Sequence, residues 1–151
     1  MEKNSDFTGE RYVPELFKKQ ENIAQMHQER YKFAAKYVSG MSVLDVACGE
    51  GYGSDMLSRE ARNLVGVDID EITINSAKDK YKRDNLKFLV GGVSNIPVKN
   101  LSIDVVVSFE TIEHVRLKEQ IAFLEEVSRI LRKDGIFIVS TPDKDVGGGG
   151  A

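Results

Sequence analysis

Apolar residues in this chain gather in five short runs, and the segments between the runs carry apolar residues at helical spacing. Each run has the length of a buried strand, and the five are 43–47, 64–68, 86–90, 103–108 and 136–140. Apolar residues recur every three or four positions in the segments 53–62, 71–82 and 116–131. Strands that alternate with helices predict an α/β fold whose sheet is mainly parallel.

The two ends of the chain differ from this alternating region. Residues 1–14 are mostly polar and indicate a flexible arm, with a lid over a site as the alternative. Residues 15–38 have the spacing of a helix that Gly40 ends. Four consecutive glycines near the C-terminus indicate a flexible tail. We therefore expect an arm and a covering helix over 1–40, a core over 41–142 and a tail over 143–151.

The apolar faces of the helical segments are expected to pack on the sheet. The residues assigned to these inward faces include Ile23, Met26 and Tyr37 of the first segment, Ile72 of the third, and Ile121 and Leu124 of the last.

The first apolar run leads straight into the glycine-rich loop 47–54, which reads ACGEGYGS. A strand that breaks into such a loop before a helix is how an open α/β sheet forms a nucleotide site. The dinucleotide fingerprint is G-x-G-x-x-G, whereas this loop has Ser54 where the third glycine would fall. Asp45, inside the strand, would repel a pyrophosphate and suits a cationic ligand that bears an ammonium and a sulfonium group.

The second apolar run ends in an acid, Asp68. It lies about 20 residues past the first glycine of the loop, which is the spacing of an acid that binds ribose hydroxyls. The ligand is thus expected to contain a ribose and no diphosphate. S-adenosylmethionine meets both conditions.

Four blocks in order carry a resemblance to a known family. They are VLDVACGEGYGS at 43–54, VGVDID at 65–70, IDVVVSFETIEHV at 103–115 and ILRKDGIFIVSTP at 130–142. The chain resembles a class I S-adenosylmethionine-dependent methyltransferase of the type 11 branch. The resemblance implies a Rossmann-like, doubly wound sheet of about five strands with helices on both faces. It also implies S-adenosylmethionine as cofactor and S-adenosylhomocysteine as product.

The family adds two further strands after the fifth, and nothing after Pro142 can supply them. We therefore expect a truncated piece of a longer protein. The open edge of the fifth strand offers a route to a homodimer.

The same blocks imply which residues hold the cofactor. By resemblance they are Asp45, Ala47, Gly49, Gly51, Asp68, Ile69, Val93, Ser94 and Phe109. Relatives commonly carry an acid for the adenine amino group where this chain has Gly92, so Val93 N–H, Ser94 or Asn95 would take over that contact. Arg30 shares the inward face of its helix with His27 and Tyr31. It either packs there or pairs with the cofactor's carboxylate.

Methyl transfer to some acceptors needs a base. His114 is the first candidate, because its ordinary pKa lies near 6.5, and Glu110 and then Glu113 come next. The alternative is that His114 only packs or caps a neighbour. Two histidines and one cysteine without metal-ligand spacing predict no metal site.

Composition narrows the choice of partner and compartment. The formal net charge is −3, so no overall basic field favours nucleic acid. Cys48 is the only cysteine, and no apolar run reaches the length of a membrane span. A cytoplasmic protein that is not embedded in a membrane is expected.

Three functional hypotheses stay open. The first is a methyltransferase acting on a small molecule, with a sugar-like or lipid-like compound as the candidate acceptor. The second is a non-catalytic module that binds the cofactor or serves a partner. The third is a nicotinamide-dependent oxidoreductase, against which Asp45 and the missing third glycine both argue.

Overall fold

The computed structural model describes residues 12–109 and 111–141, with side chains from residue 21 onward. It confirms the predicted α/β fold as one parallel sheet with the strand order β4-β3-β2-β5-β6. The strands are β2 (Ser42–Val46), β3 (Asn63–Asp68), β4 (Leu86–Val90), β5 (Ile103–Phe109) and β6 (Leu131–Ser140). The helices are α1 (Tyr12–Ala35), α2 (Tyr52–Ser58), α3 (Glu71–Lys80) and α4 (Leu117–Ile130), with a 3-10 helix at Ile112–His114.

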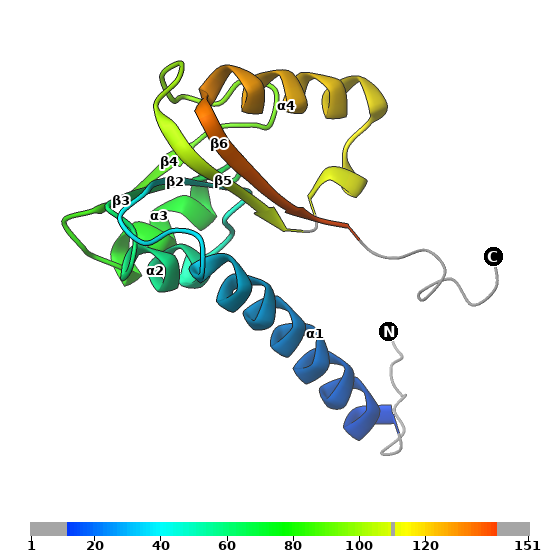
Figure 1. Cartoon of the computed structure of the whole chain (residues 1–151). Coiled ribbons are helices and arrows are strands. Elements are labelled where there is room, and N and C mark those ends of the chain that lie inside the picture. Colours follow the sequence, from blue (N-terminus) through cyan, green and yellow to red (C-terminus); the bar gives the residue numbers. More distant parts are fainter. Residues whose placement is uncertain (1–11, 110, 142–151) are drawn as a thin grey trace.

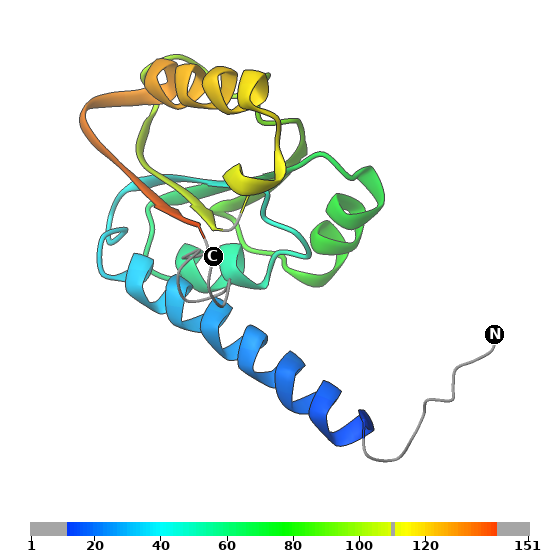
Figure 2. The same ribbon diagram turned by 90° about the vertical axis from the view of Figure 1, so that its right-hand side faces the viewer.

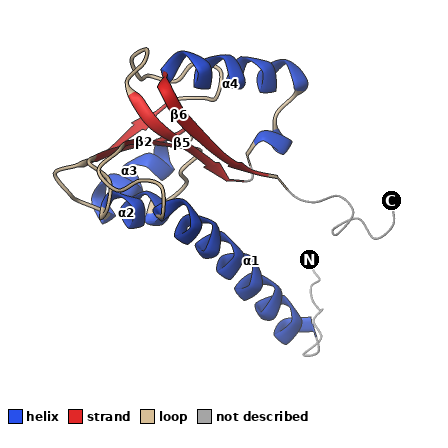
Figure 3. Ribbon diagram, in the orientation of Figure 1, coloured by secondary structure: helices blue, strands red, loops and turns tan. Residues whose placement is uncertain are grey.

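Helices cover both faces of the sheet, as the doubly wound prediction requires. Figure 1 shows α4 on one face and α1, α2 and α3 on the other, and Figure 3 separates the sheet from these layers by colour. The chain passes outward from β2 to β3 and β4, then returns to the other side of β2 with β5. Ligands of such sheets bind beyond the carboxyl ends of the strands where this reversal occurs.

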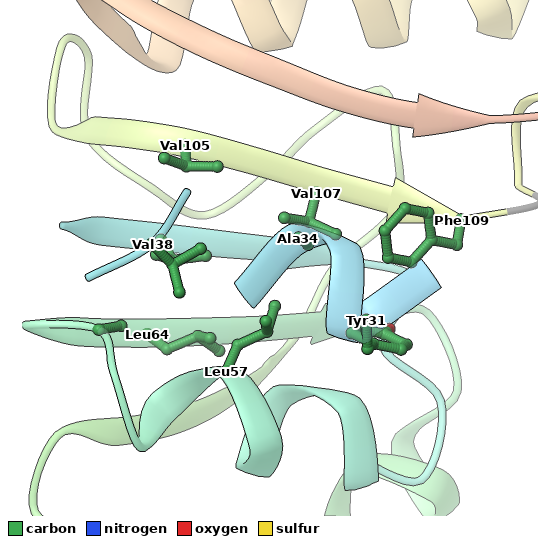
Figure 4. Close-up of a cluster of buried hydrophobic side chains, with 10 residues drawn as sticks. Tyr31, Ala34, Val38, Leu57, Leu64, Val105, Val107 and Phe109 are labelled. Atoms are coloured by element: carbon green, nitrogen blue, oxygen red, sulfur yellow. The ribbon is translucent and has the colours of Figure 1, made fainter. Parts of the chain in front are cut away.

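The core on the α1 face is built around the second half of that helix. Tyr31 and Ala34 of α1, together with Val38 just after the helix, are buried against Leu57 of α2 and the β5 residues that face them, and Figure 4 shows this cluster. The first half of α1 runs past the sheet instead (Figures 1 and 2). Burying apolar surface needs an opposing layer, and the described part of the chain gives this half none.

Several inward-facing assignments were therefore wrong. Ile23 is 57% exposed and Met26 is 53% exposed, because they lie on the part of α1 that precedes its buried residues Tyr31 and Ala34. The α4 core contacts come from one narrow stripe of Phe123, Val127 and Ile130. Ile121 and Leu124 lie beside that stripe on α4 and are exposed. Tyr37, which follows α1, and Ile72 of α3 were also assigned inward and are also exposed.

Two element boundaries also differ from the prediction. Helix α1 already begins at Tyr12, inside the segment expected to be an arm. Strand β6 begins at Leu131, before the apolar run 136–140 that was predicted to form the strand. The register explains this, since Ile103 pairs with Leu131 whereas Val105 pairs with Ile136, so the intervening residues bulge. Residues 1–11 and 142–151, which include the expected tail, lie outside the described residues.

The described helices include none that is long and apolar enough to cross a membrane.

Gly53 stands where α1 and α2 meet, and only a residue without a Cβ fits. A Cβ placed there would overlap the ring of Tyr31. That ring is itself fixed by an edge-to-face contact with Phe109, at 4.9 Å between ring centroids. The glycine thus sets how closely the two helices approach.

We expect Gly53→Ala to lower the free energy of unfolding by about 2 kcal/mol, because overpacking a filled site costs about 1–3 kcal/mol. Helix propensity alone would give the opposite sign, a gain of about 1 kcal/mol. Urea unfolding monitored by circular dichroism measures the change. Gly92→Ala is the matched control, since a Cβ there meets Ile69 at an ordinary 3.5 Å. Equal stability of the two variants would contradict the proposed overlap.

Candidate cofactor-binding site

The carboxyl ends of β2 and β3 and the loops after β4 and β5 surround a cavity of about 210 Å³. Five predicted cofactor residues line it, namely Ala47, Asp68, Ile69, Val93 and Ser94. The structure therefore brings together residues from three separate parts of the sequence at the edge of the sheet where the topology reverses.

The glycine-rich loop after β2 adopts a backbone that favours glycine. Gly49 and Gly51 have φ angles of 59° and 95°, in the left-handed region. A Cβ at Gly51 would also come within 2.8 Å of the Phe88 ring. Gly51 belongs to the loop and packs against the Phe88 ring, and it does not line the cavity.

Asp68 joins the two loops that border the cavity. One carboxylate oxygen accepts a hydrogen bond from the Gly49 backbone N–H at 2.9 Å, and the other accepts from the Asp70 N–H at 3.0 Å. The side chain remains half-buried and lines the cavity. Since each carboxylate oxygen has a second lone pair, Asp68 can still accept hydrogen bonds from a ligand's hydroxyl groups.

The opposite wall is the segment that follows β4, and α4 holds it in place. Glu126 accepts a hydrogen bond from the Ile96 N–H at 2.8 Å, and Arg129 donates to the carbonyls of Ile96 and Val98. An ion pair of 2.7 Å between Arg129 and Glu126 connects the two. The hydrogen bond from Arg129 is also the main reason that the pKa of Glu126 is lowered.

The cavity lining also includes residues that sequence reasoning did not assign, among them Thr111, Val115 and Glu119. Thr111 and Val115 belong to a matched block, 103–115, of which only Phe109, Glu110, Glu113 and His114 were singled out. Glu119 lies in the first turn of α4, where no motif indicated a binding role.

Asp45 is fully buried beneath the glycine loop. Its carboxylate accepts hydrogen bonds from the Tyr31 hydroxyl at 3.0 and 3.2 Å and from the Ser54 hydroxyl at 2.8 Å. Burial raises the pKa of Asp45 to about 7, although the hydrogen bonds from Ser54 and Tyr31 lower it. The structure thus gives Asp45 internal partners, and direct contact with a ligand stays a prediction.

The remaining predicted cofactor residues lie beside the loop. Phe109 ends β5 and is buried against Tyr31, and Arg30 is half-buried on the preceding position of α1. Neither lines the cavity. Their predicted contacts would need a ligand that extends beyond it.

Among the described residues, no predicted base lines the cavity. His114 has a side chain that is 76% exposed, with Nε2 3.4 Å from a carboxylate oxygen of Glu113. Glu110 lies outside the described residues. A role for either in proton transfer stays a prediction. Within the described ranges, no group of three or more His, Cys, Asp or Glu side chains is placed to hold a metal ion.

The raised pKa of Asp45 makes stability depend on pH. The folded pKa of about 7 exceeds the ordinary 3.8, so between these values the folded state retains a proton that the unfolded state has lost. Raising the pH from about 4 to about 7 should then lower the free energy of unfolding through this group by roughly 3 to 4 kcal/mol. The stabilisation is present below about pH 4 and is lost as the pH rises through the folded pKa of about 7.

Asp45→Asn should flatten that part of the stability profile and raise stability at pH 8. Denaturant unfolding at several pH values measures it, with Asp79→Asn, an exposed position on α3, as control. Unchanged slopes in Asp45→Asn would contradict a titrating carboxyl in the core.

Comparison with known proteins agrees with this geometry. Residues 44–139 match the Methyltransf_11 family, described as a methyltransferase domain. A "probable S-adenosylmethionine-dependent methyltransferase" of Mycolicibacterium smegmatis is 39% identical over 138 residues, which cover 91% of this chain and 51% of that protein. A phthiotriol/phenolphthiotriol dimycocerosates methyltransferase of Mycobacterium tuberculosis is 33% identical over 105 residues, covering 66% of this chain and 37% of that protein.

Solved structures give the same fold. A methyltransferase in complex with the Trm112 methyltransferase activator of Haloferax volcanii superposes with a TM-score of 0.70 and 26% identity, covering 82% of this chain and 55% of that one. The chain spans about half the length of the curated relatives it matches most fully. The matched residues include the glycine loop, Asp68 and the whole cavity lining, and this chain therefore belongs to the Methyltransf_11 family of methyltransferase domains.

Proposed function

We propose that the chain binds S-adenosylmethionine and supports methyl transfer to a small-molecule acceptor. The observation that carries this proposal is the position of Asp68, whose half-buried carboxylate lines the cavity while it is fixed by the Gly49 N–H. A fixed acceptor of this kind suits the two hydroxyl groups of a ribose.

The cavity fits the nucleoside half of the cofactor. Its volume of about 210 Å³ is below the roughly 300–1,000 Å³ of sites that enclose a whole drug-sized ligand. Ile69, which is 77% exposed, offers an apolar surface to a base. In the loop after β4, Gly92 stands in place of the family's acid. The Val93 N–H and the Ser94 hydroxyl of that loop would bind the adenine instead.

The methionine half would then pass over the glycine loop toward Phe109 and Arg30. Arg30 is a suitable partner for its carboxylate. When bound, the sulfonium supplies an activated methyl group, so the protein contributes mainly position. The internal hydrogen bonds of Asp45 hold the strand and the loop from below. Acidic Asp45 and Asp68 also favour a cationic ligand over a diphosphate.

The acceptor is proposed to be a small molecule with an apolar, lipid-like part, with a sugar-like acceptor as the alternative. Support comes from the M. tuberculosis relative, which is named as a methyltransferase of phthiotriol/phenolphthiotriol dimycocerosates. A base, where one is needed, would come from His114 or Glu110. A homodimer through a sheet edge and a cytoplasmic location remain part of the proposal.

Calorimetry with S-adenosylhomocysteine and with NAD tests the cofactor assignment. We expect the first ligand to bind and the second not to bind. Asp68→Ala should weaken S-adenosylhomocysteine binding at least tenfold, because it removes the ribose acceptor and the Gly49 contact together. Asp70→Ala, which removes a neighbouring acid that is only the N-cap of α3, is the matched control.

Binding of NAD alone would overturn the cofactor assignment. Binding of S-adenosylhomocysteine without product from any acceptor, followed with methyl-labelled S-adenosylmethionine, would favour the non-catalytic module.

A further inference from the structure

A basic depression lies at the side of the sheet, apart from the cofactor cavity. It has a volume of about 500 Å³ and shares no lining residue with that cavity. Four basic side chains and one acid line it, whereas the chain as a whole carries a net charge of −3. Local charge of the opposite sign marks a surface suited to an anionic partner.

The lysines of this depression are available for a partner. Lys78, Lys82 and Lys87 are exposed, and among the described residues none of them forms an ion pair. Arg83 differs, because its Nε donates to Asp55 at 2.7 Å. Tyr81, Leu86 and Leu89, which are partly buried, contribute apolar surface to the same depression.

The floor of the depression is an open strand edge. Strand β4 pairs with β3 on one side and is terminal in the sheet. The Asn85 carbonyl and the Gly91 N–H both bond toward β3, and alternate residues of a parallel strand share a direction. The backbone groups of Leu86, Phe88 and Val90 therefore face outward.

Of these outward groups, the Leu86 N–H bonds to the Arg83 carbonyl at 3.1 Å. Within the described residues, the N–H and C=O groups of Phe88 and Val90 have no backbone partner of this kind. The backbone groups of these two alternate residues have the spacing that is needed to pair with an added strand.

From this juxtaposition we propose that the β4 edge takes an extended acidic segment of a partner protein as an added strand. Backbone groups of Phe88 and Val90 pair with the segment, and Lys78, Lys82 and Lys87 pair with its acidic side chains. Lysines on an edge ordinarily discourage pairing between copies. Here they would also select a partner strand of opposite charge.

A second copy of this chain is a poorer occupant. Its own β4 edge would oppose lysine to lysine. Its other terminal strand, β6, carries Arg132 and Lys133 beside one acid, Asp134. Charge complementarity thus favours a different protein.

The test uses an end-capped eight-residue peptide that alternates Glu and Val, titrated into the 151-residue chain. Calorimetry measures affinity, and NMR-detected hydrogen exchange reports on single amides. We expect binding that weakens at least tenfold between 50 mM and 500 mM salt, as screening of exposed charges requires. The Phe88 and Val90 amides should become protected from exchange. A peptide that alternates Lys and Val should not bind.

The double variant Lys82→Glu, Lys87→Glu should weaken binding of the Glu–Val peptide at least tenfold, with circular dichroism unchanged. Lys118→Glu, an exposed lysine at the start of α4, is the matched control and should bind as before. Binding of S-adenosylhomocysteine should persist in the double variant, which separates this proposal from the cofactor site.

Three outcomes would overturn the proposal. One is absence of peptide binding at millimolar concentration. Another is binding without protection of Phe88 and Val90. The third is equal binding of tripolyphosphate or of phosphatidylserine vesicles in competition with the peptide, which would show a general anion surface.

Discussion

A carboxylate without access to water needs donors around it, and Asp45 draws its two donors from different helices. Tyr31 reaches it from α1, and Ser54 reaches it from α2. The contact with Tyr31 requires α1 and α2 to lie close together, which the missing side chain of Gly53 permits. The same Tyr31 ring contacts Phe109 at the end of β5. One buried acid therefore ties the covering helix, the glycine loop and the central strands into a single unit.

The cofactor cavity depends on that unit from below and on α4 from above. Asp68 fixes the glycine loop on one wall. Glu126 and Arg129 fix the opposite wall through the backbone of Ile96 and Val98. The support from below thus comes from α1 and α2 and the support from above from α4, on opposite faces of the sheet, and the two walls meet where the strand order reverses. Packing on both faces of the sheet therefore fixes the positions of the loops that form the cavity.

The sequence predicted what depends on local chemistry. Strand lengths, the glycine loop and the acid at the end of β3 are local signals, and Asp68 with its neighbours lies where they indicated. Predictions of which apolar helix residues are buried against the sheet were less accurate. Ile121 and Leu124 are apolar and helically spaced, yet only the adjoining stripe reaches the sheet. Thr111 and Glu119 enter the cavity through the tertiary arrangement of β5 and α4, for which no motif exists.

The position of Cys48 gives the loop an internal reporter. It is the sole cysteine, it is 7% exposed within the loop, and burial, followed by the charge of Asp45, raises the pKa of its thiol. Because the thiolate is the species that reacts, alkylation has to wait until the loop lifts away from Asp68 and the core. The rate of thiol labelling would consequently measure how often the loop opens at this one residue, without any attached dye. A ligand that closes the loop would appear as protection of one sulfur atom.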